Sequence, residues 1–187
     1  MKTFTFRVVV DTEEDIFRDI EIGCNQNFEE FHDAIVKAFQ FKGDQMASFY
    51  MSNELWEKGK EIALMDMGSL EGEGSTLSMK STKLMTEVVE KNQKILYVYD
   101  FFKMWIFYID LIAINENSKT LNLPATVLSF GESPNEDDKE IDDIFESYQE
   151  GFDDEFEDKF DEDSDDDFND DDDPFGEFQG GYEEDEY

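Results

Sequence analysis

The chain has 187 residues and a formal net charge of −35, so it carries no basic stripe with which to displace counterions from nucleic acid. Its single cysteine, Cys24, excludes an internal disulfide and a four-cysteine zinc site and fits a reducing cytoplasm. The charge is uneven, because residues 136–187 hold 28 acidic and 2 basic residues, a net charge of −26, which leaves −9 for residues 1–135. We therefore expect one folded body with an acidic tail.

Two strands are predicted at the start of the chain. Apolar residues alternate with polar ones over residues 4–10, which predicts the first strand. Arg7 interrupts the apolar run, so this stretch is not a secretory signal. The second strand is predicted over residues 16–22, and Asp19 and Glu21 would lie on its solvent face.

A helix is the clearest predicted element. Asn27 and Glu30 form a capping pair, and we expect the helix to end near Gly43. Its apolar face recurs at helical spacing and consists of Phe28, Phe31, Ile35, Ala38 and Phe39.

Shorter elements follow this helix. Pro124 cannot donate to a strand ladder, so the last predicted strand cannot be interior at that point. The predicted elements are strands over 46–51 and 62–65, a glycine-rich flexible loop over 68–75, a short helix over 81–89, a last strand within 121–130, and a boundary at 131–134.

Residues 95–114 form the most apolar and most aromatic stretch of the chain, and they predict a hairpin. The first half alternates with a period of two, and residues 105–114 are apolar on both faces. A strand that is apolar on both faces belongs in the middle of a sheet, covered on both sides. Phe102 and Lys103 would form the tight turn.

A transmembrane helix is the competing interpretation of residues 95–114, because the stretch is long enough to span a bilayer. Asp100, Lys103 and Asp110 lie inside it, and charges within a membrane span are costly. The hairpin is therefore preferred, and we expect no membrane association.

The last quarter of the chain divides into two predicted parts. Residues 136–160 predict an amphipathic acidic helix or linker, and residues 161–187 predict disorder, because they cannot bury enough apolar surface to offset ordering. The phenylalanines among the acidic residues suit a partner-binding segment, although a merely solubilising tail is an equal alternative. These phenylalanines are Phe152, Phe156, Phe160, Phe168, Phe175 and Phe178.

Two sharper interpretations of the tail fail on detail. Asp161, Asp163 and Asp165 alternate as in a calcium loop, but Asp166 stands where that loop requires glycine. Residues 170–175 (DDDDPF) are similar to the acidic tip of bacterial single-strand-binding proteins, but there the motif is terminal and here twelve residues follow. We assign no metal and no cofactor.

Several motifs within residues 3–136 resemble the plasmid pRiA4b ORF-3-like family. The most diagnostic family pattern is Y-x-Y-D-F-G-D-x-W-x-H, which Tyr97, Tyr99, Asp100, Phe101 and Trp105 match. The other matches are the strand segments 6–8 (FRV) and 16–19 (IFRD), the helix segment 31–39 (FHDAIVKAF), which includes His32, and the closing segment with Pro124 and residues 131–134.

The resemblance implies a small α+β protein of a bacterial and archaeal family that is often associated with plasmid or transposon functions and has no established biochemical activity. The chain departs from the pattern at polar positions, since Phe102 and Lys103 replace Gly-Asp and Phe107 replaces His. Gln45 and Asp19 replace a further His and Arg. If that surface acts in other members, we expect its activity to be lost or changed here.

The polar candidates have plain structural interpretations. His32, the only histidine, lies at the edge of the apolar face, so packing at the boundary is favoured over catalysis or metal binding. Asp100 is expected to accept hydrogen bonds from the backbone of the turn. Cys24 has no evident neighbouring base, so we expect a passive thiol, and catalytic residues stay unassigned.

The sequence therefore predicts a single α+β domain over residues 1–135, with a mixed or mostly antiparallel sheet, one principal helix, and the hairpin at its centre. We expect a monomeric binding protein rather than an enzyme, whose tail engages a protein with a basic surface. Competition with nucleic acid for that partner is a variant of this hypothesis. The alternative is a small enzyme, or an accessory protein of a mobile element, with a degenerate site near Asp100 and His32.

Overall fold

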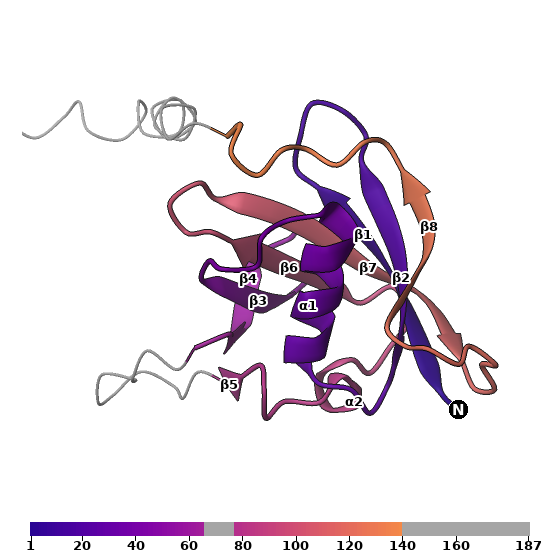
Figure 1. Ribbon diagram of the computed structural model, residues 1–187. Coiled ribbons are helices and arrows are strands. Elements are labelled where there is room, and N and C mark those ends of the chain that lie inside the picture. Colours follow the sequence, from indigo (N-terminus) through magenta and orange to yellow (C-terminus); the bar gives the residue numbers. More distant parts are fainter. Residues whose placement is uncertain (66–76, 140–187) are drawn as a thin grey trace, which may run out of the picture. The chain divides into compact units, whose positions relative to one another are not determined.

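A computed structural model describes residues 1–65 and 77–139, and within them one sheet of eight strands carries a single long helix (Figure 1). The elements are β1 (Thr3–Val10), β2 (Phe17–Gly23), α1 (Phe28–Phe39), β3 (Ala47–Ser52), β4 (Lys58–Ala63), β5 (Leu77–Ser78), α2 (Leu84–Glu87), β6 (Lys94–Tyr99), β7 (Trp105–Asn115) and β8 (Ala125–Phe130). The sheet order is β5-β4-β3-β6-β7-β1-β2-β8, and every neighbouring pair except β4–β5 is antiparallel. The predicted α+β class and mixed sheet are confirmed.

The hairpin at the centre of the sheet is also confirmed. β6 and β7 pair in antiparallel register from Lys94–Asp110 to Tyr99–Trp105 and are the fourth and fifth strands of the order. The same stretch is therefore no membrane helix, and no described helix is both long and apolar enough to cross a bilayer.

The turn of this hairpin is longer than the two residues expected. Residues 100–104 lie between the strands, and Asp100 and Met104 take left-handed backbone angles, with φ of 56° and 51°. A two-residue hairpin turn would require a left-handed angle at the bulky Phe102, and in the type I′ form at Lys103 as well. In the longer loop these angles fall on Asp100 and Met104 instead. Asp is one of the residue types that adopt the left-handed region more often than most.

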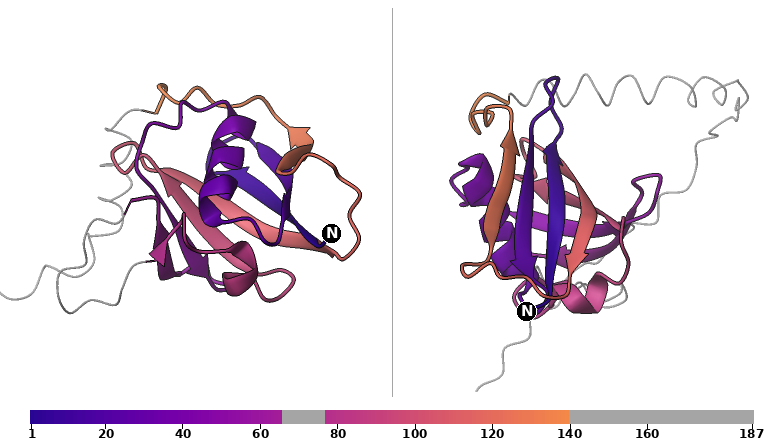
Figure 2. Two further views of the ribbon diagram at one scale, coloured as in Figure 1. Left: turned by 60° about the horizontal axis from the view of Figure 1, so that its bottom comes forward. Right: turned by 90° about the vertical axis from the view of Figure 1, so that its right-hand side faces the viewer.

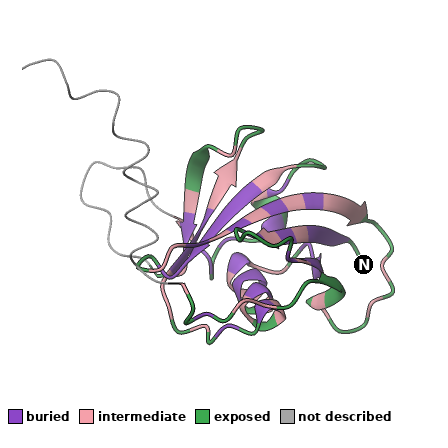
Figure 3. Ribbon diagram, turned by 90° about the horizontal axis from the view of Figure 1, so that it is seen from above, coloured by how far each residue is buried: buried purple, intermediate pink, exposed green. Residues whose placement is uncertain are grey.

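Only one face of β7 is fully buried, which corrects the expectation of a strand covered on both sides. Trp105, Phe107, Ile109 and Leu111 are buried, whereas the alternate residues from Ile106 to Ile112 are half-buried. The reason is that α1 lies against one face of the sheet (Figure 2). Buried positions, purple in Figure 3, run along the strands and through α1.

Helix α1 begins as predicted and ends earlier. The Asn27 side chain accepts a hydrogen bond of 2.8 Å from the Glu30 N–H, and the Glu30 carboxylate accepts one of 2.9 Å from the Asn27 N–H. Gln40 ends the helix with a left-handed φ of 61°, three residues before Gly43. The buried face packs aromatic on aromatic, with the Phe31 ring 4.6 Å from that of Phe6 and 5.4 Å from that of Phe49.

Asp19 and Glu21 on β2 are buried, not solvent-facing as expected, with exposed fractions of 5% and 8%. The pairing of β1 with β2 places the side chains of Arg7 and Thr3 against these two carboxylates. Arg7 donates two hydrogen bonds of 2.8 Å to Asp19, and the hydroxyls of Thr3 and Thr120 donate to Glu21 at 2.6 and 2.7 Å.

The shorter strands and the short helix are of the predicted type, but their bounds differ from the predicted ones. β4 starts at Lys58, which lies opposite Ser52 at the end of β3, and the pairing runs back to Ser48 opposite Ala63. α2 is a single turn instead of a helix over 81–89. β8 is the edge strand beside β2 and begins directly after Pro124, as that proline requires.

Several predictions fall outside the described residues. These are the loop at 68–75, the acidic helix or linker at 136–160 beyond residue 139, the tail at 161–187 and all six of its phenylalanines.

Candidate functional site

The residues of the family-like motif are mostly part of the core. Tyr97, Tyr99 and Trp105 are buried, and Phe101 lies partly exposed at the turn. The Tyr97 hydroxyl lies 2.7 Å from Nδ1 of His32, and both side chains are buried. Burial lowers the pKa of His32 and raises that of Tyr97 well above its ordinary value, so both groups are held neutral. His32 therefore lies inside the core, not at its boundary.

Asp100 stabilises the hairpin turn. Its Oδ1 accepts hydrogen bonds from the backbone N–H groups of Phe102 at 3.0 Å and Lys103 at 3.2 Å, as the sequence predicted. The residue is 7% exposed. Asp100 and His32 thus have separate structural partners, and neither lines either of the two cavities described below.

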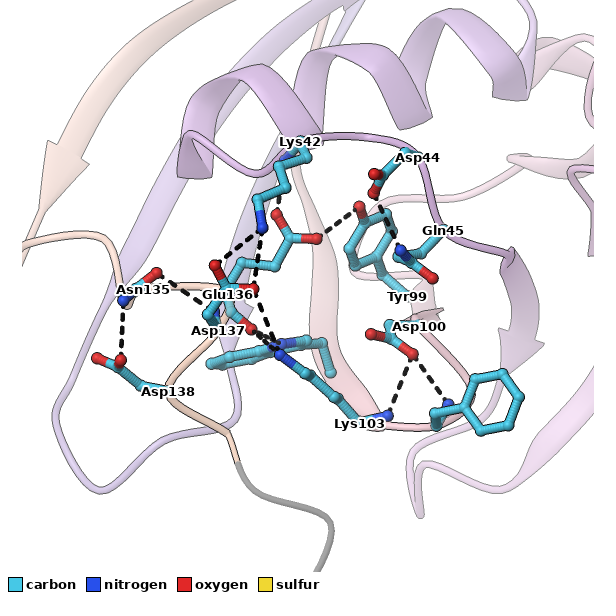
Figure 4. A network of polar contacts seen from close by, with 12 residues as sticks. Lys42, Asp44, Gln45, Tyr99, Asp100, Lys103, Asn135, Glu136, Asp137 and Asp138 are labelled. Atoms are coloured by element: carbon cyan, nitrogen blue, oxygen red, sulfur yellow. Dashed lines mark hydrogen bonds and ion pairs between the residues drawn. The ribbon is translucent and has the colours of Figure 1, made fainter.

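A polar junction that the sequence did not indicate lies beside this turn (Figure 4). Its centre is Glu136, whose side chain is buried although it belongs to the first acidic run after Pro134. One carboxylate oxygen accepts a hydrogen bond of 2.9 Å from the Tyr99 hydroxyl, and the other accepts one of 2.6 Å from the backbone N–H of Lys42. We call the set Lys42, Tyr99, Lys103, Trp105 and Glu136 the Glu136 junction.

The main chain of Glu136 is held as well as its side chain. Its carbonyl accepts hydrogen bonds from the Lys103 ammonium at 3.1 Å and from the Trp105 indole at 3.3 Å. The Tyr99 hydroxyl in turn accepts one of 2.9 Å from the Gly43 N–H. Burial and the hydrogen bond to Glu136 raise the pKa of Tyr99 to about 12. The junction therefore fixes the end of the described chain to the hairpin.

Residues 137–139 add outer contacts to the junction. Asp137 forms ion pairs with Lys42 at 2.8 Å and Lys103 at 3.5 Å, and its hydrogen bond from Lys42 lowers the pKa of this carboxyl. The Lys139 ammonium donates a hydrogen bond of 2.7 Å to the carbonyl of Met104 and lies over the Trp105 ring. The contacts of the body thus continue past residue 135, where the sequence placed its end.

Arg18 is the second group that the sequence did not single out. It lies on β2, is 4% exposed and donates to the carbonyls of Phe17 at 2.8 Å, Phe130 at 2.7 Å and Ala38 at 3.2 Å. Its Nη2 donates a hydrogen bond of 2.9 Å to the Ser133 hydroxyl oxygen. Burial lowers the pKa of this guanidinium. Arg18 thereby links β2, the last turn of α1 and the segment after β8.

A cavity of about 520 Å³ lies between Arg18 and the Glu136 junction. Its lining includes Arg18, Phe39, Gln40, Ser133, Pro134 and Glu136. A second cavity of about 250 Å³ lies beside the buried thiol of Cys24 and is lined mainly by apolar side chains. Within residues 1–65 and 77–139, no three His, Cys, Asp or Glu side chains are placed to hold a metal ion.

The sequence held only a weak signal for these residues. Arg18 stands within the IFRD segment of the motif, but charge and spacing alone do not reveal that a strand residue reaches the end of α1. Glu136 is one acidic residue among 28 in the last quarter of the chain, so nothing marks it as buried.

Comparison with known proteins agrees with this architecture. The family model described as plasmid pRiA4b ORF-3-like protein matches residues 2–173, which extends past residue 136, where the motif resemblance was expected to end. The crystal structure of MM3350, a protein of unknown function from Methanosarcina mazei Go1, is similar with a TM-score of 0.60 and 22% identity, over 83% of this chain and 84% of that one. At this identity the likeness concerns the fold. None of the curated proteins matches the chain.

Proposed function

This chain belongs to the plasmid pRiA4b ORF-3-like protein family, and we propose that it is a non-enzymatic binding module whose acidic, aromatic tail engages a protein with a basic surface. The observation that carries the proposal is the charge division, with −26 on residues 136–187 against −9 on the rest. A charge of that density keeps a segment extended and attracts cationic partners.

Several cations of the body are already engaged in ion pairs. Among the described residues, ion pairs with the body's own carboxylates already engage Lys2, Arg7, Lys60 and Lys94. Lys42 and Lys103 pair with Asp137 at the root of the tail. Residues 1–135 hold 13 basic residues, too few to neutralise a segment with a net charge of −26. This imbalance favours a basic surface on another molecule as the tail's counterpart.

The Glu136 junction supports the same interpretation. Because Glu136 is bonded through both its side chain and its carbonyl, the chain enters the tail from a fixed point on the body. A segment tethered at a fixed point presents its binding residues at a high effective concentration beside that point. The body is then the scaffold, and the six phenylalanines supply apolar anchors.

The alternative of a small enzyme near Asp100 and His32 finds no support among the described residues. Asp100 accepts two backbone hydrogen bonds within its turn, and His32 is buried against Tyr97. A reaction site needs a cavity that joins its candidate groups. Neither described cavity is lined by either residue.

The test compares three forms of the protein in binding a basic amphipathic peptide, followed by fluorescence anisotropy at two salt concentrations. The forms are the full chain, a full chain with all six tail phenylalanines changed to serine, and a chain ending after residue 139. Ending at 139 rather than 135 preserves Glu136 and its contacts.

We expect the serine variant to bind at least about tenfold more weakly than the full chain, which is roughly 1.4 kcal/mol. The chain ending at 139 should not bind measurably. Equal affinity of the full chain and the serine variant would contradict aromatic anchoring and leave a solubilising tail. Binding that is unchanged on removal of residues 140–187 would contradict the proposal altogether.

A further inference from the structure

Arg18 is a buried charge without an opposite charge beside it. Its four hydrogen-bond acceptors are three carbonyls and a hydroxyl, and no carboxylate of the described residues forms an ion pair with it. Arg7, the other arginine of the chain, instead forms a two-point ion pair with Asp19. A buried guanidinium that lacks a counter-ion is costly, so an added anion would offset part of that cost.

The cavity of about 520 Å³ gives an anion access to this charge, because Arg18 and Ser133 both line it. Arginine has five N–H donors, and Arg18 uses four of them in hydrogen bonds within the protein. The fifth is on Nη2. Ser133 accepts from Nη2 at 2.9 Å, which leaves its own hydroxyl proton available to donate. Two donors therefore lie side by side.

The other lining residues select the charge and shape of the ligand. Glu132, Glu136 and Lys42 also line the cavity, and the Lys42 ammonium is already paired with Asp137. A doubly charged phosphate would therefore meet two carboxylates, whereas a single negative charge would meet less repulsion. Phe39 and Pro134 add apolar surface. A carboxylate has two oxygens, one for the remaining N–H of Arg18 and one for the Ser133 hydroxyl, and the volume lies within the usual range for small-molecule sites.

We propose that this cavity binds the carboxylate of a small organic acid through the guanidinium of Arg18 and the hydroxyl of Ser133. The proposal does not rest on the binding function proposed above, and among the described residues the cavity touches the acidic segment only at Glu136. Arg18 also ties β2 to α1 and to Phe130, and that role uses the four donors already engaged. The ligand requires only the fifth donor and the Ser133 proton, so both roles are compatible.

Binding at Arg18 can be observed directly by NMR. The chain has only two arginines, so a proton–nitrogen spectrum contains only two Nε–H signals, and each can be assigned to one residue. Both Nε–H groups are engaged in hydrogen bonds, Arg7 with Asp19 and Arg18 with Ala38, which protects them from exchange. The full-length protein is titrated with benzoate, with benzamide as the uncharged control of the same shape, and with inorganic phosphate, all at constant ionic strength.

We expect a saturable shift of the Arg18 signal with benzoate, while the Arg7 signal stays in place and benzamide has no effect. Ser133→Ala should weaken the binding at least about tenfold, and Ser129→Ala on exposed β8 should leave it unchanged. Four results would overturn the proposal: no shift, equal shifts of both arginines, equal effects of benzamide and benzoate, or a saturable response to phosphate alone. An affinity unaffected by Ser133→Ala would also overturn it.

Discussion

The Tyr99 hydroxyl donates a hydrogen bond of 2.9 Å to the carboxylate of Glu136, across 37 positions of sequence. Through its second oxygen, Glu136 also accepts from the Lys42 N–H. One buried carboxylate thus joins the loop after α1, the end of β6 and the last segment of the described chain. Removing it leaves the buried Tyr99 hydroxyl and the partly buried N–H of Lys42 without their acceptor, and an unsatisfied buried donor costs more than a balanced loss of both partners.

Glu136→Ala is therefore expected to lower the free energy of unfolding by about 1–3 kcal/mol. Asp138→Ala is the matched control, because Asp138 is exposed and bonds only to Asn135. Urea unfolding followed by tryptophan fluorescence measures both variants, and Trp105 reports on the junction directly. Equal stability of the two variants would show that the Glu136 junction does not hold the body together.

Gly131 is required where the chain leaves β8. Its φ is +74°, and a Cβ there would lie 2.9 Å from Cγ1 of Ile16 and 3.0 Å from the carbonyl oxygen of Asp15. Gly131→Ala should thus cost roughly 1–3 kcal/mol in thermal or urea unfolding. Gly23→Ala is the comparison, because its Cβ would meet only the flexible side chain of Gln26. We expect a clearly smaller loss there, and the reverse order would refute this account of the turn.

The raised pKa of Tyr99, about 12 against an ordinary value near 10, makes stability depend on alkaline pH. Below pH 10 the side chain is neutral in both states, and its contribution is fully present. Between about pH 10 and 12 the unfolded chain loses the proton while the folded protein keeps it, so the free energy of unfolding falls. The Tyr99→Phe variant should show a shallower fall over this window. Parallel profiles for the two proteins would contradict the raised pKa.

The buried His32 makes the free energy of unfolding depend on pH on the acid side. There it falls as the pH decreases, whereas Tyr99 makes it fall as the pH rises. Burial lowers its pKa below the ordinary value of about 6.5, so on acidification the unfolded chain takes up the proton first. The free energy of unfolding should consequently fall as the pH drops below about 6.5, until the folded-state pKa is reached. His32→Gln keeps a polar partner for Tyr97 without titrating, so its profile should be flatter from pH 7 to 5. A wild-type profile no steeper than the variant's would count against a buried neutral His32.

Local patterns in the sequence determined much of this protein. The capping pair of Asn27 and Glu30, the alternation along β1 and β6, and the position of Pro124 before β8 each follow from neighbours within a few residues. The charge division between residues 135 and 136 is likewise a property of composition alone. Asp100 belongs with them, since its partners are two and three residues away.

Only the tertiary structure decided which polar groups are buried and with what. Asp19 looked exposed until the pairing of β1 with β2 placed Arg7 opposite it, and Glu136 looked like any acidic residue until Tyr99 and Lys42 met it. The single buried face of β7 depends on which side of the sheet α1 occupies. The physical reason is the same in each case. Burial and hydrogen bonding of a charged group are set by residues distant in sequence, whose positions no local period encodes.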